Sequence, residues 1–142
     1  MDDVELTHRE CVRLLRSPER GRRGIVAIDG LTPALRICLL LDAGDVLIPT
    51  GPDSGLVRVA ALRPVSLEFT DQDKDGRLRW TVRGIGLARP MTGLDVPRPV
   101  PRSTVLAAMP DAFRNGVRVV VARYRGNRSV IPAPRDGSEP RG

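Results

Sequence analysis

The fold of this chain is decided by the stretch from Leu35 to Met91, which reads LRICLLLDAGDVLIPTGPDSGLVRVAALRPVSLEFTDQDKDGRLRWTVRGIGLARPM. Short apolar runs alternate with turn residues along it, and this pattern predicts four or five strands in succession. One polar loop, Thr50–Gly55 (Thr-Gly-Pro-Asp-Ser-Gly), interrupts the strands near the middle. Its backbone N–H groups and hydroxyls are of the kind that can hold an anion. The stretch therefore predicts a β-rich fold with one candidate binding loop.

Further elements are predicted around these strands. Gly24–Ile28 precedes them as a short strand that follows a basic loop, and Val117–Tyr124 is an apolar final strand bounded by Asn-Gly and Gly-Asn. Leu56–Leu62 fits either a two-turn helix or a strand, because so short a run has no decisive periodicity. Near the start of the chain, Thr7 and Glu10 have the spacing of a capping box, which indicates a helix.

Six or seven short strands with two or three brief helices indicate a mainly β fold. We expect a six-stranded antiparallel split β-barrel of the Greek-key type, because closure removes the exposed edges that a strand-rich chain must otherwise protect. A single domain is predicted over residues 1–131. Residues 132–142 carry almost no apolar surface and are expected to be disordered. Pro90–Pro101 is rich in proline and glycine and predicts a surface excursion.

The composition argues against nucleic-acid binding. The chain of 142 residues has a net charge of +6, and 22 of its 23 basic residues are arginines, scattered among 17 acidic residues. Its four aromatic residues offer few platforms on which bases could stack. A basic chain without a basic stripe or aromatic platforms is not expected to take nucleic acid as its partner.

Other residue types exclude further classes. Cys11 and Cys38 lie in apolar contexts and do not make a disulfide framework. One histidine without paired cysteines does not indicate a metal site. No apolar run approaches the roughly 20 residues that span a bilayer, and the acidic start Met-Asp-Asp-Val-Glu lacks an apolar signal core. A cytoplasmic protein without a metal or a membrane partner is expected.

Three segments carry a resemblance to a known family. They are Arg36–Leu41 (RICLLL), Pro64–Phe69 (PVSLEF) and Thr81–Ala88 (TVRGIGLA). In this order and spacing, together with the polar loop, they resemble the pyridoxamine 5'-phosphate oxidase-like family, the flavin-binding split barrels. The resemblance covers roughly Leu6 to Tyr124. It implies FMN as the cofactor, with the related deazaflavin coenzyme or no cofactor as alternatives.

The resemblance also implies which residues would contact the cofactor. These are Arg36, Ile37, Cys38, Thr50, Gly51, Ser54, Arg58 and Thr81. The strand that begins at Arg36 would run along the edge of the isoalloxazine ring, and Thr81 would make a polar contact to that ring. Thr50, Gly51 and Ser54 would cradle the phosphate, although the same loop also fits an ordinary turn. No catalytic side chain is implied.

The chain departs from the family at its phosphate-binding cations. Gly55 and Leu56 stand where a basic residue usually follows the serine, and Leu41 stands where the family has a second lysine. A phosphate is held firmly by charge-assisted donors. Arg58 could replace the missing cations, as could Arg36 or Arg83, because the arginine fork matches phosphate oxygens.

The function implied is that of an oxidoreductase-like protein that transfers hydride between a flavin or deazaflavin and a small molecule of unknown identity. The resemblance implies a homodimer with the cofactor in a cleft between its subunits. The missing lysines favour a second hypothesis, a barrel that has lost its cofactor and serves as a binding or interaction protein. A third hypothesis, a module for polyanions, rests on the excess of arginine.

Overall fold

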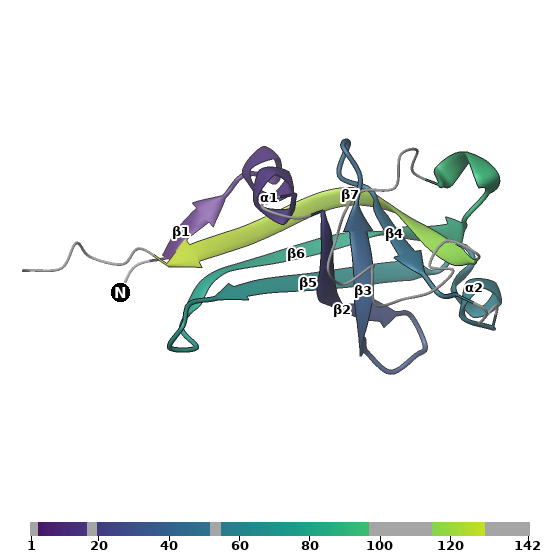
Figure 1. Cartoon of the computed structure of the whole chain (residues 1–142), viewed down its shortest axis with the longest axis horizontal. Helices are drawn as coiled ribbons and strands as arrows, with labels where there is room; N and C mark the ends of the chain where they lie inside the picture. Colours follow the sequence, from purple (N-terminus) through teal and green to yellow (C-terminus); the bar gives the residue numbers. More distant parts are fainter. Residues whose placement is uncertain (1–2, 17–19, 52–54, 97–114, 130–142) are drawn as a thin grey trace, which may run out of the picture.

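The computed structural model describes residues 3–16, 20–51, 55–96 and 115–129 (Figure 1). Its elements, in chain order, are β1 (Asp3–Leu6), α1 (His8–Leu15), β2 (Gly21–Ile28), β3 (Ala34–Leu40), β4 (Val46–Pro49), α2 (Gly55–Ala60), β5 (Pro64–Gln72), β6 (Leu78–Pro90), the short 3-10 helix η1 (Gly93–Asp95) and β7 (Gly116–Ser129). Ser54 and the predicted tail, residues 132–142, lie outside the described residues.

The strands form one antiparallel sheet that closes on itself. They follow the order β7-β4-β3-β2-β5-β6, and β6 pairs with β7 to complete a six-stranded barrel. Strands β2, β3 and β4 are consecutive neighbours, and the chain then returns through α2 to place β5 beside β2, which is a Greek-key connection. The predicted fold class is confirmed. Strand β1 is an addition that pairs with the far end of β7.

The core lies inside the barrel because side chains alternate between its two faces. On β5, for example, Val65, Leu67 and Phe69 are buried while Ser66 and Thr70 are exposed. Helix α1 begins with the expected capping box, in which Glu10 N–H donates to Thr7 Oγ1 (3.2 Å) and Thr7 N–H donates to Glu10 Oε1 (2.9 Å). It packs Cys11 and Leu15 into the same core. Both cysteines are free and buried.

Strand β7 carries a bulge where it pairs with the middle of β6. The register of the two strands shifts between Ile85 and Gly86 of β6. A Cβ atom built at Gly86 would lie 2.2 Å from the backbone carbonyl oxygen of Val120. Only glycine allows the two backbones to approach so closely, and the extra residue on β7 increases the local bend that barrel closure needs.

Two predicted boundaries are corrected, and one open choice between helix and strand is resolved. Strand β2 begins at Gly21 rather than Gly24, because its residues from Gly21 onward already pair with β3. On this part of the strand, Arg22 donates to the carbonyl oxygens of Leu14 and Leu15 (3.3 and 2.9 Å) at the end of α1. Its guanidinium also lies 5.3 Å from the centre of the Trp80 ring.

The open choice concerns α2, and the second correction concerns β7. The ambiguous segment after the polar loop is the helix α2, since Leu56 and Ala60 are its buried residues. Strand β7 runs through the Gly126-Asn127 pair, which the sequence predicts as its end, because β1 and β6 pair with it on opposite sides there. Within the described residues, no helix is long and apolar enough to cross a membrane.

Candidate functional site

The polar loop is fixed against the start of β7. Thr50, directly after β4, donates its N–H to the carbonyl oxygen of Asn115 (3.0 Å). The Asn115 side-chain amide donates in return to the carbonyl oxygen of Gly51 (2.8 Å). Gly51 is buried and has a left-handed backbone with φ of 61°. Two predicted site residues, Thr50 and Gly51, are therefore held in a defined turn.

The hydroxyl of Thr50 is a buried polar atom whose bonding capacity is unused. Among the described residues it has no hydrogen-bond partner. Buried polar groups are almost always hydrogen-bonded, so such an orphan requires an explanation. A hydroxyl can donate to an anionic oxygen, and the residues of this turn therefore fit a phosphate group. Arg58 lies nearby in sequence on α2, and its side chain is exposed.

The predicted residues of β3 are divided between the two faces of the strand. Cys38 lies fully buried in the barrel core, and this burial raises the pKa of its thiol to about 12. Its thiol donates a weak hydrogen bond to the carbonyl oxygen of Arg36 (3.6 Å). Ile37, on the other face, packs against the buried Leu39 and Leu47. A cofactor beside this strand would meet Cys38 through its backbone, while Arg36 is half-buried.

Thr81 lies near the opposite end of the molecule. It is half-buried on the outer face of β6, beside a hollow of about 630 Å³. The residues lining this hollow are Glu5, Thr81, Arg83, Ile85, Arg123, Arg125, Gly126 and Asn127. We call it the arginine hollow.

One chain does not bring Thr50 and Thr81 together. Pro49, the residue before Thr50, pairs with Gly116 at one end of β7, whereas Thr81 pairs with Asn127 near the other end. A strand rises about 3.3 Å per residue, so on the order of 35 Å of β7 separates these two pairing positions. A single ligand that contacts both threonines would need a second copy of the chain.

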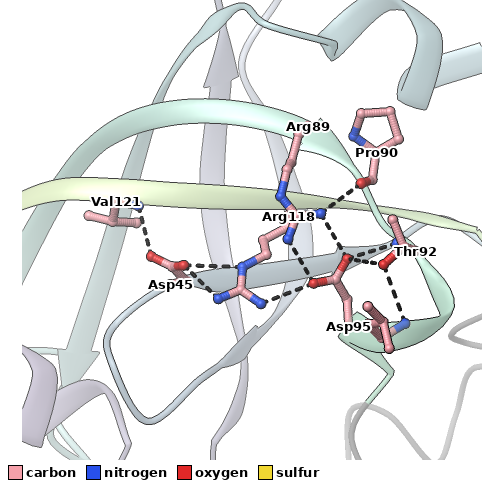
Figure 2. A network of polar contacts seen from close by, with 8 residues as sticks. Asp45, Arg89, Pro90, Thr92, Asp95, Arg118 and Val121 are labelled. Carbon is pink, nitrogen blue, oxygen red and sulfur yellow. Dashed lines mark hydrogen bonds and ion pairs between the residues drawn. The ribbon is translucent and has the colours of Figure 1, made fainter.

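A partly buried ionic network near η1 was not predicted from the sequence (Figure 2). Asp95 receives two hydrogen bonds of 2.8 Å from Arg89 and one of 3.0 Å from Arg118. Arg118 also contacts Asp45 (2.8 Å), whose second oxygen accepts the N–H of Val121 (3.1 Å). The side chain of Asp95 is only 4% exposed. The hydrogen bonds from Arg89 are the main reason that the pKa of Asp95 is held well below its ordinary value.

This network adds to the prediction for Pro90–Pro101. Pro90 still belongs to β6, and the network ties the residues up to Asp95 to the barrel, while residues 97–101 lie outside the described residues. Asp95 also accepts the N–H of Thr92 (2.7 Å), which closes a capping box at η1. No motif marked these residues, because Asp45 and Arg118 are far apart in sequence and meet only when β4 pairs with β7.

An apolar patch covers part of the outer face of the sheet. Ile85, Leu87 and Val120 are 58, 53 and 47% exposed. They lie on β6 and β7, and Leu87 pairs directly with Val120. A shallow hollow of about 650 Å³ adjoins them, with Pro64, Val65 and Ala122 in its lining. The patch meets the arginine hollow at Ile85, which lines both.

Comparison of the sequence with protein-family models and with curated proteins gives no match. Solved structures that share the fold include an FAD-binding protein from Mycobacterium smegmatis, with a TM-score of 0.59 and 22% identity over 91% of this chain and 100% of its own. A candidate pyridoxamine 5'-phosphate oxidase from Corynebacterium glutamicum has a TM-score of 0.61 and 20% identity over 94% and 99%.

A third structure, a protein assigned to the general stress family from Xanthomonas campestris, has a TM-score of 0.63 and 16% identity over 89% of this chain and 91% of its own. The chain therefore has the fold of the pyridoxamine 5'-phosphate oxidase-like split barrels. The resemblance that the sequence carries is confirmed for the fold.

Proposed function

We propose that this protein is a homodimeric split barrel that binds a flavin-type cofactor, FMN or the related deazaflavin, and acts as an oxidoreductase on a small molecule. The observation that carries the proposal is the buried Thr50 hydroxyl, which has no partner among the described residues at the turn where the resemblance expects a phosphate. The similarity to an FAD-binding protein supports a flavin rather than another phosphorylated ligand.

Different residues of the chain would contact the phosphate and the ring of the cofactor. Thr50 and the turn at Gly51 would hold the phosphate, Arg58 would add the positive charge that the missing lysines do not supply, and Arg36 would lie beside the ring. Thr81 of a second protomer would supply the polar contact to the ring. A bound flavin supplies hydride transfer, while the protein contributes position and electrostatics.

The first expected result concerns the Thr50 hydroxyl. Thr50→Val keeps the shape of the side chain and removes the hydroxyl. A hydrogen bond to a charged group contributes about 1.5–3 kcal/mol, so the affinity for FMN is expected to fall about 10- to 100-fold. Quenching of flavin fluorescence during titration with protein measures this change. FAD and the deazaflavin coenzyme are titrated in parallel.

Thr32→Val is the matched control, because Thr32 is an exposed threonine between β2 and β3 and is not a residue of the proposed site. It is expected to bind the flavin with the affinity of the unaltered protein. Equal binding by Thr50→Val and Thr32→Val would show that the turn does not hold the phosphate.

The second expected result concerns the dimer. The exposed apolar patch supports self-association, since large exposed apolar surfaces commonly mark interfaces. Leu87→Glu places a charge at the centre of the patch and is expected to weaken dimerisation at least tenfold, as measured by sedimentation. Leu94→Glu is the control, because Leu94 is 98% exposed on η1, outside the patch. A protein that sediments as a monomer at all concentrations would contradict the proposal.

A second candidate function is a barrel without a cofactor that acts as a binding protein. It is favoured by Leu41, which stands at a family lysine position and packs with the buried Leu39 and Leu47. That position serves packing in this chain and offers no cation. This candidate would be favoured by a folded, dimeric protein that does not quench the fluorescence of FMN, FAD or the deazaflavin coenzyme.

A further inference from the structure

Two pairs of arginines occupy directly opposed positions on the neighbouring strands β6 and β7. Arg89 pairs directly with Arg118, and Arg83 pairs directly with Arg125. Like charges at directly opposed positions of an antiparallel pair destabilise the sheet. Nearby negative charge offsets this repulsion, and the two pairs differ in how much of it the chain provides.

The chain supplies the negative charge for the first pair. Asp95 contacts both Arg89 and Arg118, and Asp45 contacts Arg118 from the other side, at distances of 2.8–3.1 Å (Figure 2). Two carboxylates thus neutralise two guanidinium groups. This arrangement shows how the fold stabilises opposed arginines when it uses them structurally.

The second pair is not neutralised in this way. Arg83 reaches Glu68 at 3.3 Å, through an ion pair in which the arginine side chain is 68% exposed. Among the described residues, Arg125 makes no ion pair, and neither does Arg123, which lies opposite Ile85 on the same face. Glu5 shares the hollow with these arginines but contacts none of them within ion-pair distance. The site keeps an excess of positive charge.

The surroundings of these arginines have the form of a small-molecule site. The arginine hollow, about 630 Å³, lies within the range of ligand pockets. Thr81 and Asn127 add hydrogen-bonding side chains to its lining. A second hollow of about 340 Å³ shares Arg123 and Arg125 and extends the site toward α1. Guanidinium groups bind carboxylates and phosphates through two parallel hydrogen bonds.

We infer that the arginine hollow binds the carboxylate or phosphate group of a small anionic ligand, with Arg123 and Arg125 as its main contacts. On the proposed function, Thr81 lies at the ring end of the flavin, so this anion belongs to the substrate. That assignment rests on the proposed function, whereas the anion site itself does not.

The test uses the full chain without any cofactor. Inorganic phosphate is titrated at constant ionic strength against chloride, and binding is followed by calorimetry and by the rise in Tm. Phenyl phosphate and benzoate are then compared, so that a phosphate ester and a carboxylate are distinguished. Saturable binding of at least one of these anions is expected, with an affinity at least tenfold lower in Arg123→Gln/Arg125→Gln.

The control variant is Arg23→Gln/Arg77→Gln, which removes the same charge from two exposed arginines outside the hollow. It is expected to bind anions like the unaltered protein. An equal loss in both variants would mean that net charge alone attracts the anion, and it would overturn the inference, as would the absence of saturable binding. Because Arg125→Gln removes a repulsive pair, the Tm of the ligand-free variant is not expected to fall.

The result of this anion titration can be distinguished from the result of the flavin titration. Anion binding without flavin binding would keep the site and remove its assignment to a redox substrate. Flavin binding without anion binding would keep the proposed function and overturn this inference.

Discussion

Gly86→Ala is expected to destabilise the barrel by about 3 kcal/mol or more, a cost at the upper end of that for overpacking a core. The new Cβ atom would lie 2.2 Å from the carbonyl oxygen of Val120 and 2.9 Å from Cα of Val121. Both contacts are with backbone atoms, so no side-chain rotation can relieve them. Strand β7 would have to move away from β6 at the point where the barrel closes.

Urea unfolding followed by circular dichroism measures this loss. Gly93→Ala is the matched control, because a Cβ atom at Gly93 meets nothing within 4 Å. Its free energy of unfolding is expected to change by no more than about 0.5 kcal/mol, as at most surface positions. A Gly86→Ala protein as stable as Gly93→Ala would mean that the two strands are not packed this closely.

Asp95→Asn is expected to destabilise the protein by about 2–4 kcal/mol at pH 7. Removing one partner of a buried ion pair leaves its counter-charges unpaired, which costs about 3–5 kcal/mol in well-buried cases. Asp95 is buried, but Arg89 and Arg118 are 39 and 25% exposed and keep part of their hydration, which reduces the cost. Arg118 also retains Asp45.

The loss of stability in Asp95→Asn is expected to become smaller at low pH. The pKa of Asp95 is lowered in the folded protein, mainly by Arg89, so the folded state favours the charged form. The stabilisation is therefore fully present above the pKa of the unfolded chain, about 3.9. It is lost as the pH falls below that value toward the lower pKa of the folded state. The difference in unfolding free energy between the unaltered protein and Asp95→Asn should therefore narrow below about pH 4.

Asp42→Asn is the control for this experiment. Asp42 contacts Arg16 and Arg20, but its side chain is 73% exposed. Exposed ion pairs contribute about 0–1 kcal/mol, so little change in stability is expected at any pH. Equal losses in Asp95→Asn and Asp42→Asn would show that the network near η1 is no more stabilising than a surface contact.

Much of the barrel could be predicted because its signals are local. The capping box of α1 and the strand alternation of β5 depend on residues a few positions apart. The end of β7 could not be predicted in this way. Gly126-Asn127 has the composition of a turn, but a Cβ atom at Gly126 would lie 2.7 Å from the carbonyl oxygen of Thr81. The glycine permits close strand pairing, a reason visible only when β6 is in place.

The candidate site, like the barrel, could be predicted only where its signals are local. The turn at Thr50 follows from its own polar residues, and the structure holds it as a turn. The network of Asp45, Asp95 and Arg118 depends on residues 23–73 positions apart, and no spacing rule connects them. The opposition of Arg83 and Arg125 likewise requires the register of two long strands.

Strand β7 pairs with β1, β4 and β6, so the last strand among the described residues takes part in three of the strand pairings of the sheet. During synthesis on the ribosome, β4 and β6 emerge before this partner exists. Their unpaired edges remain open until residues 116–129 have left the exit tunnel, and unpaired edges invite association with other chains. The barrel therefore closes only after β7 has been synthesised, and a chain that stops before Gly116 would be a target for chaperones or proteases.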